Sequence, residues 1–149
     1  MGVEIDLRDM PGHLIRRLNQ NSASVFHSRV KAAGYDLTSV QFAALFTLHK
    51  LPGIDQATLA RQIAYDRATI GGVVDRLERK SLVVRKVNKR DRRARLLELT
   101  DEGEQFLEQI KPIVADLQRD ILGTLTNDER SYFMQLAKKV LQMEQESEA

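Results

Sequence analysis

The stretch between residues 55 and 100 constrains the fold of this chain more than any other part. It contains two short segments with helical spacing of apolar residues, at about 56–63 and 67–80, and each follows an aspartate. Because aspartate is a favoured N-cap residue, both segments are predicted to be helices that begin there. The second has one apolar stripe, formed by Ile70, Val73, Val74 and Leu77. Two short helices joined by a tight turn predict a helix-turn-helix.

A β-hairpin is predicted directly after these helices. Residues 82–87 and 94–99 are rich in apolar and β-branched side chains and flank a polar loop. Cations crowd this hairpin, with seven against the single anion Asp91 within eleven residues: Arg85, Lys86, Lys89, Arg90, Arg92, Arg93 and Arg95. A helix-turn-helix with such a hairpin attached is a shape that reads duplex DNA.

The rest of the chain is predicted to be helical. Asp9 is the expected N-cap of the first helix, and capping boxes stand at Thr38-x-x-Gln41 and Thr126-x-x-Glu129. The predicted helices span residues 10–33, 38–50, 101–122 and 127–141. Pro112 is expected to kink the helix at 101–122. The last helix is expected to bury Phe133, Leu136, Val140 and Leu141.

These patterns predict a mainly α fold with a small β-hairpin, in one domain of residues 1–149. A winged helix-turn-helix lobe at 38–100 would be flanked by dimerisation helices at 10–33 and 101–145. The terminal helices carry more apolar surface than a small three-helix layer can hide, which favours a homodimer. The alternative is a monomer with a larger core.

Charge is distributed unevenly along the chain, although the net charge is only +2. Residues 1–60 carry six basic and five acidic side chains, residues 61–97 carry twelve and four, and residues 98–149 carry five and twelve. This asymmetry predicts a polyanionic partner for the middle of the chain.

Composition excludes several functions. The absence of cysteine excludes disulfides and thiolate chemistry. The histidines form no metal-binding pair, and no nucleophile–base pair or phosphate-binding loop is visible, so we expect no metal, cofactor or catalytic residue. No apolar run approaches the roughly 18 residues that span a bilayer. The acidic N-terminus lacks a signal-peptide pattern, so we expect a cytoplasmic protein.

Small residues line the predicted exposed face of the helix at 67–80. Glycine in a helix interior costs about 1 kcal/mol relative to alanine, so Gly71 and Gly72 need an explanation. Either the backbone approaches the floor of a major groove, or it packs closely against another helix, and the sequence leaves both open. In the first case the candidate DNA contacts on this helix are Arg67, Ala68, Thr69, Gly71, Gly72, Arg76 and Arg79.

The hairpin loop favours DNA contact more directly, although a charge run is often only a solvated face. Extended arginines on a β-tip can enter the minor groove, where negative potential is focused. Asp91 is expected to orient a neighbouring arginine by a charge-assisted bond. The cations expected to contact phosphates are Lys89, Arg90, Arg92 and Arg95.

Three segments resemble the MarR family of winged-helix transcriptional regulators, and the similarity extends along nearly the whole chain. They are L-A-R-Q-I-A-Y-D-R-A-T, V-V-D-R-L-E-R-K-S-L-V and D-R-R-A-R-L-L-E-L-T-D-E-G, the last with the family's D-x-R and L-T-x-x-G signatures. The resemblance implies that the 67–80 helix reads the major groove and that Arg93 enters the minor groove while Asp91 holds it. It also implies a homodimer. Ser81 stands where the family usually has glycine.

The resemblance also implies a small-molecule effector, often an aromatic acid, that releases DNA. The segment P-G-H-L-I-R-R-L resembles the branch that senses aromatic carboxylates or their CoA thioesters. Arg16 or Arg17 would bind the carboxylate and His13 a second polar group, on the side near Phe46 and His49. The alternative is that both arginines are solvated or pair with acids of the partner chain.

The leading hypothesis is a ligand-responsive, dimeric repressor that binds a pseudo-palindromic DNA operator and catalyses no reaction. Ligand would change the distance between the two recognition helices. The alternative is a winged-helix module that docks an acidic protein. Duplex binding with a steep salt dependence would separate the two.

Overall fold

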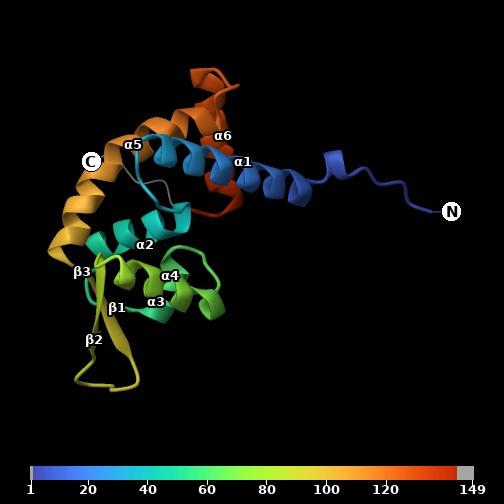
Figure 1. Ribbon diagram of the computed structural model, residues 1–149. Helices are drawn as coiled ribbons and strands as arrows, with labels where there is room; N and C mark the ends of the chain where they lie inside the picture. Colours follow the sequence, from blue (N-terminus) through green and yellow to red (C-terminus); the bar gives the residue numbers. More distant parts are fainter. Residues whose placement is uncertain (1, 144–149) are drawn as a thin grey trace.

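The computed structural model describes residues 2–143 (Figure 1). Its helices are η1 (Leu7–Asp9, a 3-10 turn), α1 (Pro11–Ala32), α2 (Ser39–Lys50), α3 (Gln56–Gln62), α4 (Arg67–Arg79), α5 (Asp101–Ile121) and α6 (Asn127–Val140). Its strands are β1 (Ile54–Asp55), β2 (Val83–Val87) and β3 (Arg95–Leu99). The predicted mainly α fold with a winged helix-turn-helix is confirmed.

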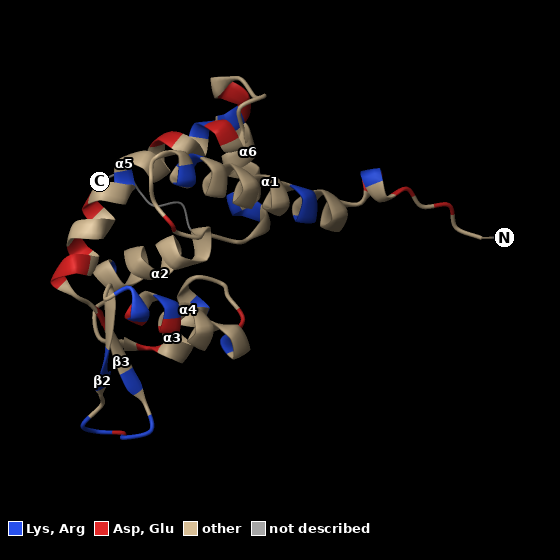
Figure 2. Cartoon of the chain, in the orientation of Figure 1, with Lys and Arg blue, Asp and Glu red and all other residues tan. Residues whose placement is uncertain are grey.

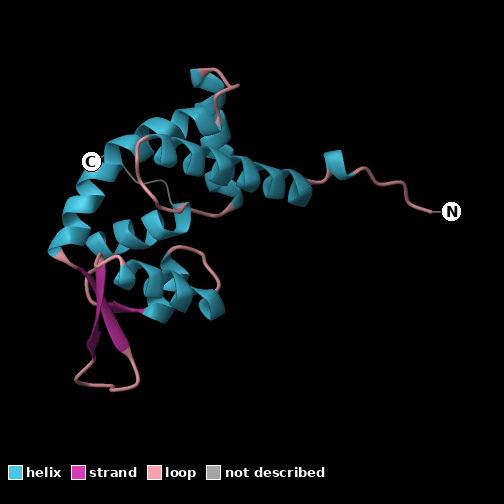
Figure 3. Ribbon diagram, viewed as in Figure 1, coloured by secondary structure: helices cyan, strands magenta, loops and turns pink. Residues whose placement is uncertain are grey.

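The hairpin is part of a three-stranded antiparallel sheet in the order β1-β3-β2 (Figure 3). The two-residue strand β1 pairs Ile54 with Leu97, and the N–H of Gly53 donates to Leu97 O at 2.9 Å. The sequence did not predict β1, because a two-residue strand has no periodicity to detect. It ties the start of α3 to the base of the wing.

Most helix starts match the predicted caps. Both capping boxes are present, and Asp55 and Asp66 accept bonds from Thr58 N and Ala68 N. The Asp9 prediction was wrong: Asp9 ends η1, and α1 begins after Met10, which makes no side-chain cap bond. Pro at the first position of α1 supplies the start instead.

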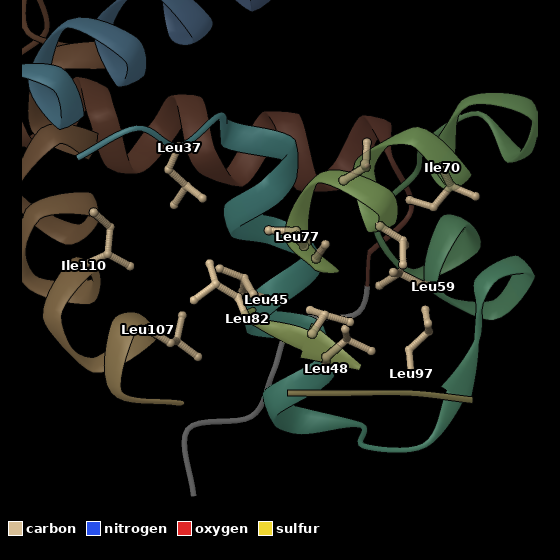
Figure 4. Close-up of a cluster of buried hydrophobic side chains, with 14 of the residues drawn as sticks. Leu37, Leu45, Leu48, Leu59, Ile70, Leu77, Leu82, Leu97, Leu107 and Ile110 are labelled. Carbon is tan, nitrogen blue, oxygen red and sulfur yellow. The ribbon is translucent and has the colours of Figure 1, made fainter. Parts of the chain in front are cut away.

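The core lies between the helix-turn-helix and its neighbours (Figure 4). Helix α2 is central, and its residues Ala44, Leu45 and Leu48 are almost fully buried. Around it pack the apolar stripe of α4, the bases of β2 and β3, and α5. The second half of α1 joins through Phe26 and Val30, and Arg29 pairs with Asp116 and Asp120 on α5.

A close backbone contact joins the wing to α5. Thr100 caps α5 through Gly103 N, its own N–H donates to Leu82 O at 3.1 Å, and its hydroxyl donates to Ser81 O at 2.6 Å. A Cβ at Gly103 would overlap Leu82 O, so the glycine of the L-T-x-x-G signature is required here. Ser81 has φ 62°, the left-handed conformation that favours glycine, as its position after the recognition helix implied.

The two ends of the described chain contrast with this core. No residue of α6 is buried, and Leu136, Val140 and Leu141 are 42%, 76% and 69% exposed. The prediction that they lie inside was therefore wrong for a single chain, because no other described element covers them. α5 continues through Pro112 and curves along its length (Figure 1). None of the described helices is long and apolar enough to cross a bilayer.

Candidate nucleic-acid interface

Helix α4 turns one face to the core and leaves the other open. Ile70, Val73, Val74 and Leu77 are buried, whereas Arg67, Ala68, Thr69, Gly72 and Arg76 are exposed. Asp66 Oδ1 accepts from Ala68 N at 2.9 Å, and the Thr69 hydroxyl donates to Asp66 O at 3.1 Å. The first turn of α4 is thus internally bonded and presents its exposed side chains from a fixed backbone.

The two glycines of α4 are not explained by packing within the described chain. A Cβ at Gly72 would meet nothing within 4 Å, and one at Gly71 would lie 3.7 Å from Gln56 Nε2, an ordinary contact. Of the two interpretations left open by the sequence, close packing against another helix of residues 2–143 is therefore excluded. The remaining interpretation is that another molecule approaches this backbone closely.

The wing tip is basic and exposed. Figure 2 shows its loop as an almost unbroken run of cations with one acidic residue. Lys86 is paired with Glu98 at 2.6 Å, and Arg85 turns inward, so two of the seven cations are neutralised. The other five form no ion pair with residues 2–143: Lys89, Arg90, Arg92, Arg93 and Arg95.

Asp91 acts on the backbone of the wing. Its Oδ1 accepts from Arg93 N at 3.0 Å, and its carbonyl accepts from Ala94 N at 3.1 Å. The expectation that its carboxylate orients an arginine side chain is corrected: Asp91 shapes the turn from which Arg93 projects. Asn88 does the same at the other side, accepting from Arg90 N.

A cleft of about 430 Å³ separates the wing from the helix-turn-helix. Three arginines and two aspartates line it. Arg67 comes from α4, Asp91, Arg93 and Arg95 from the wing, and Asp55 from β1. Thr58 N donates to Asp55 Oδ1 at 2.8 Å and lowers the pKa of that carboxyl, as do Arg61 and Arg67 to a smaller degree. The structure thus brings the N-terminus of α4 and the wing arginines to one basic hollow.

The other end of α4 borders a second hollow of about 380 Å³. Arg76, Arg79 and Lys80 line it together with Thr38 and other residues from the start of α2. The cations of α4 are therefore split between the two hollows, with Arg67 in the first.

The five residues proposed for an effector do not converge within one chain. The N-terminal end of α1, which carries His13, Arg16 and Arg17, projects away from the lobe (Figure 1). Both arginines are exposed. His49 is held instead by Glu104, with Nδ1 2.7 Å from Oε2, and Phe46 stacks on Phe42. Within residues 2–143 the structure therefore does not bring His13, Arg16 and Arg17 to Phe46 and His49.

A basic wing beside the open face of a helix-turn-helix defines a winged-helix DNA-binding protein. The model of the MarR family matches residues 37–94. The HTH-type transcriptional repressor NicR of Pseudomonas putida is 32% identical over 136 residues, covering 91% of this chain and 85% of the relative. This chain belongs to the MarR family of transcriptional regulators.

Solved structures agree along most of the chain. The PcaV regulator of Streptomyces coelicolor, described in complex with its natural ligand, is 35% identical with a TM-score of 0.81 and covers 95% of this chain and 98% of its own. BpsR of Bordetella bronchiseptica is 26% identical with a TM-score of 0.85, covering 94% and 99%. The DNA binding of BpsR is described as regulated by 6-hydroxynicotinic acid.

Proposed function

We propose that this protein is a ligand-responsive repressor that binds a pseudo-palindromic operator as a homodimer. The observation that carries the proposal is the joint placement of Arg67, Arg93 and Arg95 at one cleft beside the open glycine face of α4. The repressor NicR supports the direction of regulation. The protein acts by binding alone, in the cytoplasm, and catalyses no reaction.

The proposed contacts divide between the two grooves of DNA. The α4 backbone at Gly71 and Gly72 approaches the major groove, where small residues let Thr69 and Arg76 reach base edges. Arg93 enters the neighbouring minor groove, whose negative potential attracts arginine. The remaining α4 and wing positions contact phosphates or support them: Arg67, Ala68, Lys89, Arg90, Asp91, Arg92 and Arg95.

The homodimer is supported by the uncovered apolar side chains of α6 and of the N-terminal end of α1. Exposed residues there include Leu14, Ile15 and Leu18 on α1, and Tyr132, Met134, Leu136 and Val140 on α6. A twofold pair that covers these faces would set the two copies of α4 about one DNA turn apart, roughly 34–36 Å.

The proposed effector is an aromatic carboxylic acid, in line with the acid described for BpsR. Arg16 or Arg17 remains the proposed carboxylate-binding residue and His13 the partner of a second polar group, with a second copy rather than Phe46 and His49 completing the site. A planar guanidinium fork matches a carboxylate. A CoA thioester is kept as a test compound.

DNA binding is tested with a duplex selected by the protein from a randomised library. We expect affinity to fall steeply with salt, by nearly one unit of log K per phosphate contact per decade. Arg93→Ala should weaken binding by about tenfold and leave folding unchanged. Arg119→Ala, an exposed arginine of α5, is the matched control. A flat salt dependence would instead favour docking to an acidic protein.

The effector proposal needs its own assay. Thermal melting with 6-hydroxynicotinic acid, other aromatic acids and their CoA thioesters should identify compounds that stabilise the protein. The same compounds should release the selected duplex. One of the two variants Arg16→Ala and Arg17→Ala should abolish release without weakening DNA binding in the absence of ligand. Release that persists in both variants would remove these arginines from the effector site.

A further inference from the structure

Arg85 on β2 turns toward the helix-turn-helix and away from solvent. Its Nη2 forms an ion pair with Asp75 Oδ1 at 2.7 Å, its Nη1 donates to Glu78 Oε1 at 3.2 Å, and its Nε donates to Gln56 Oε1 at 3.0 Å. Nη2 also lies 3.4 Å from Gly71 O. Its side chain is only 21% exposed. One guanidinium thus joins β2 to the first residue of α3 and to two turns of α4.

These contacts direct all three nitrogens of the Arg85 guanidinium at the protein. Of its five N–H groups, three donate hydrogen bonds, one each from Nε, Nη1 and Nη2, and Nη2 also forms the ion pair with Asp75. The group is therefore held by the protein and is not free to follow a phosphate or a base. Arg85 therefore differs from Arg93, which is exposed and has no side-chain ion pair with residues 2–143.

The bonds also fix a geometry that DNA binding depends on. The guanidinium is planar and rigid, so acceptors on two sides set both the distance and the angle between β2 and α4. α4 and the wing must enter neighbouring grooves of the DNA together. If the angle between β2 and α4 is wrong, only one of them can reach its groove in the correct position. Arg85 also offsets negative charge of Asp75 and Glu78 on the very helix that approaches DNA.

We propose that Arg85 is a positioning residue that sets the wing relative to α4 without touching DNA. This inference rests on the proposed DNA-binding function. It assigns to Arg85 a share of sequence specificity, because specific binding needs both grooves to be occupied in register while non-specific binding does not.

The test compares Arg85→Lys and Arg85→Gln with wild-type protein on two duplexes, the library-selected one and a scrambled one. Lysine keeps the charge but cannot hold three acceptors in a fixed fork. Both variants should lose about tenfold in affinity for the selected duplex, with little change on the scrambled one. The slope of log K against log salt should stay as in wild type, because no phosphate contact is removed.

Arg93→Ala is the matched comparison, since it should lower the salt slope and weaken binding to both duplexes. A double-mutant cycle of Arg85→Gln with Asp75→Asn should give a combined loss smaller than the sum, because both remove the same bond.

Three outcomes would overturn the inference. In the first, Arg85→Lys binds the selected duplex as wild type does. In the second, the salt slope falls as for Arg93→Ala, which makes Arg85 a DNA contact. In the third, affinity is lost only in step with the fraction of protein that melts at the assay temperature. If wild-type protein binds no duplex at all, the proposed function fails first, and the two failures are therefore distinct.

Discussion

The winged lobe and the terminal helices of this chain both carry many apolar side chains, but they differ in how far these side chains are buried. The lobe closes a core around α2 in which leucines such as Leu45, Leu59 and Leu97 have no exposed surface. Helix α6 has a comparable supply of apolar side chains and buries none of them. The difference lies in partners within the chain, not in hydrophobicity.

The comparison teaches where each region obtains its stability. The core of the lobe is closed by contacts within residues 2–143, because α4, the bases of β2 and β3, α5 and the second half of α1 pack around α2. The exposed faces of α6 and of the N-terminal end of α1 are not covered by other residues of 2–143, and in the proposed homodimer a second copy would cover them. Four substitutions test this division, beginning with the one expected to have the largest effect.

Gly103→Ala should destabilise the winged lobe, where the core is closed. The added Cβ overlaps Leu82 O, a backbone atom that is also bonded to Thr100 N, so the strand and the start of α5 must separate. We expect the free energy of unfolding to drop by about 3 kcal/mol or more. Urea denaturation measures it. A loss of unfolding free energy below about 1 kcal/mol would show that the backbone around Gly103 and Leu82 can shift to make room for the methyl group.

Leu136→Asp should weaken association through the exposed face of α6 and leave the fold of the lobe unchanged. In the proposed homodimer this face is buried between the two copies, so a carboxylate there should raise the dimer dissociation constant by about tenfold to a hundredfold. Sedimentation velocity across a concentration series measures this constant. Gln135→Asp, at an exposed neighbouring position, is the control and should leave association unchanged. Equal behaviour of the two variants would remove α6 from the interface.

Gly72→Ala should separate stability from function within the lobe. Nothing lies within 4 Å of the added Cβ, so helix propensity should stabilise the protein by about 1 kcal/mol. DNA affinity should fall, because the methyl group occupies space that the major-groove floor needs. Thermal melting and duplex titration measure the two effects. A variant that is more stable and binds equally well would place the DNA away from this backbone.

Asp55→Asn should produce the smallest effect, and one that depends on pH. The folded-state pKa of Asp55 is lowered by its bond from Thr58 N, so its charged form stabilises the fold. That stabilisation is fully present above the unfolded pKa, about 3.9, and is lost as pH falls through the lower folded pKa. Asparagine should cap α3 nearly as well. Unfolding curves of the two proteins should therefore differ at neutral pH by less than about 1 kcal/mol and converge in acid.

The sequence predicted most of the lobe because local signals there agree with one another. Capping residues, the apolar stripe of α4 and the two apolar segments that flank the polar loop of the hairpin each predicted an element on their own. Strand β1 was not predicted, because its two residues pair only with β3, which is distant in the sequence. The buried side of α6 was misjudged because an apolar face does not say which molecule covers it.

The site was predicted less completely, since charge counts do not give direction. Arg85 was grouped with the other cations of the wing, yet it pairs across the sheet with Leu97 and shares a face with buried Val83. Because side chains alternate between the two faces of a strand, the sequence of β2 already places residue 85 on the same face as residue 83. The placement of Asp91 against a backbone N–H, and of His49 against Glu104, depends on turn and helix packing that no spacing rule supplies.

The uneven charge of the chain also has a kinetic consequence. With an excess of eight cations in residues 61–97 and of four anions in residues 98–143, the described part of the molecule is an electric dipole although the net charge of the chain is small. A polyanion exerts a torque on such a dipole before contact, so the wing turns toward DNA while the acidic helices turn away. Encounters should begin in a productive orientation, and added salt should slow association before it speeds release.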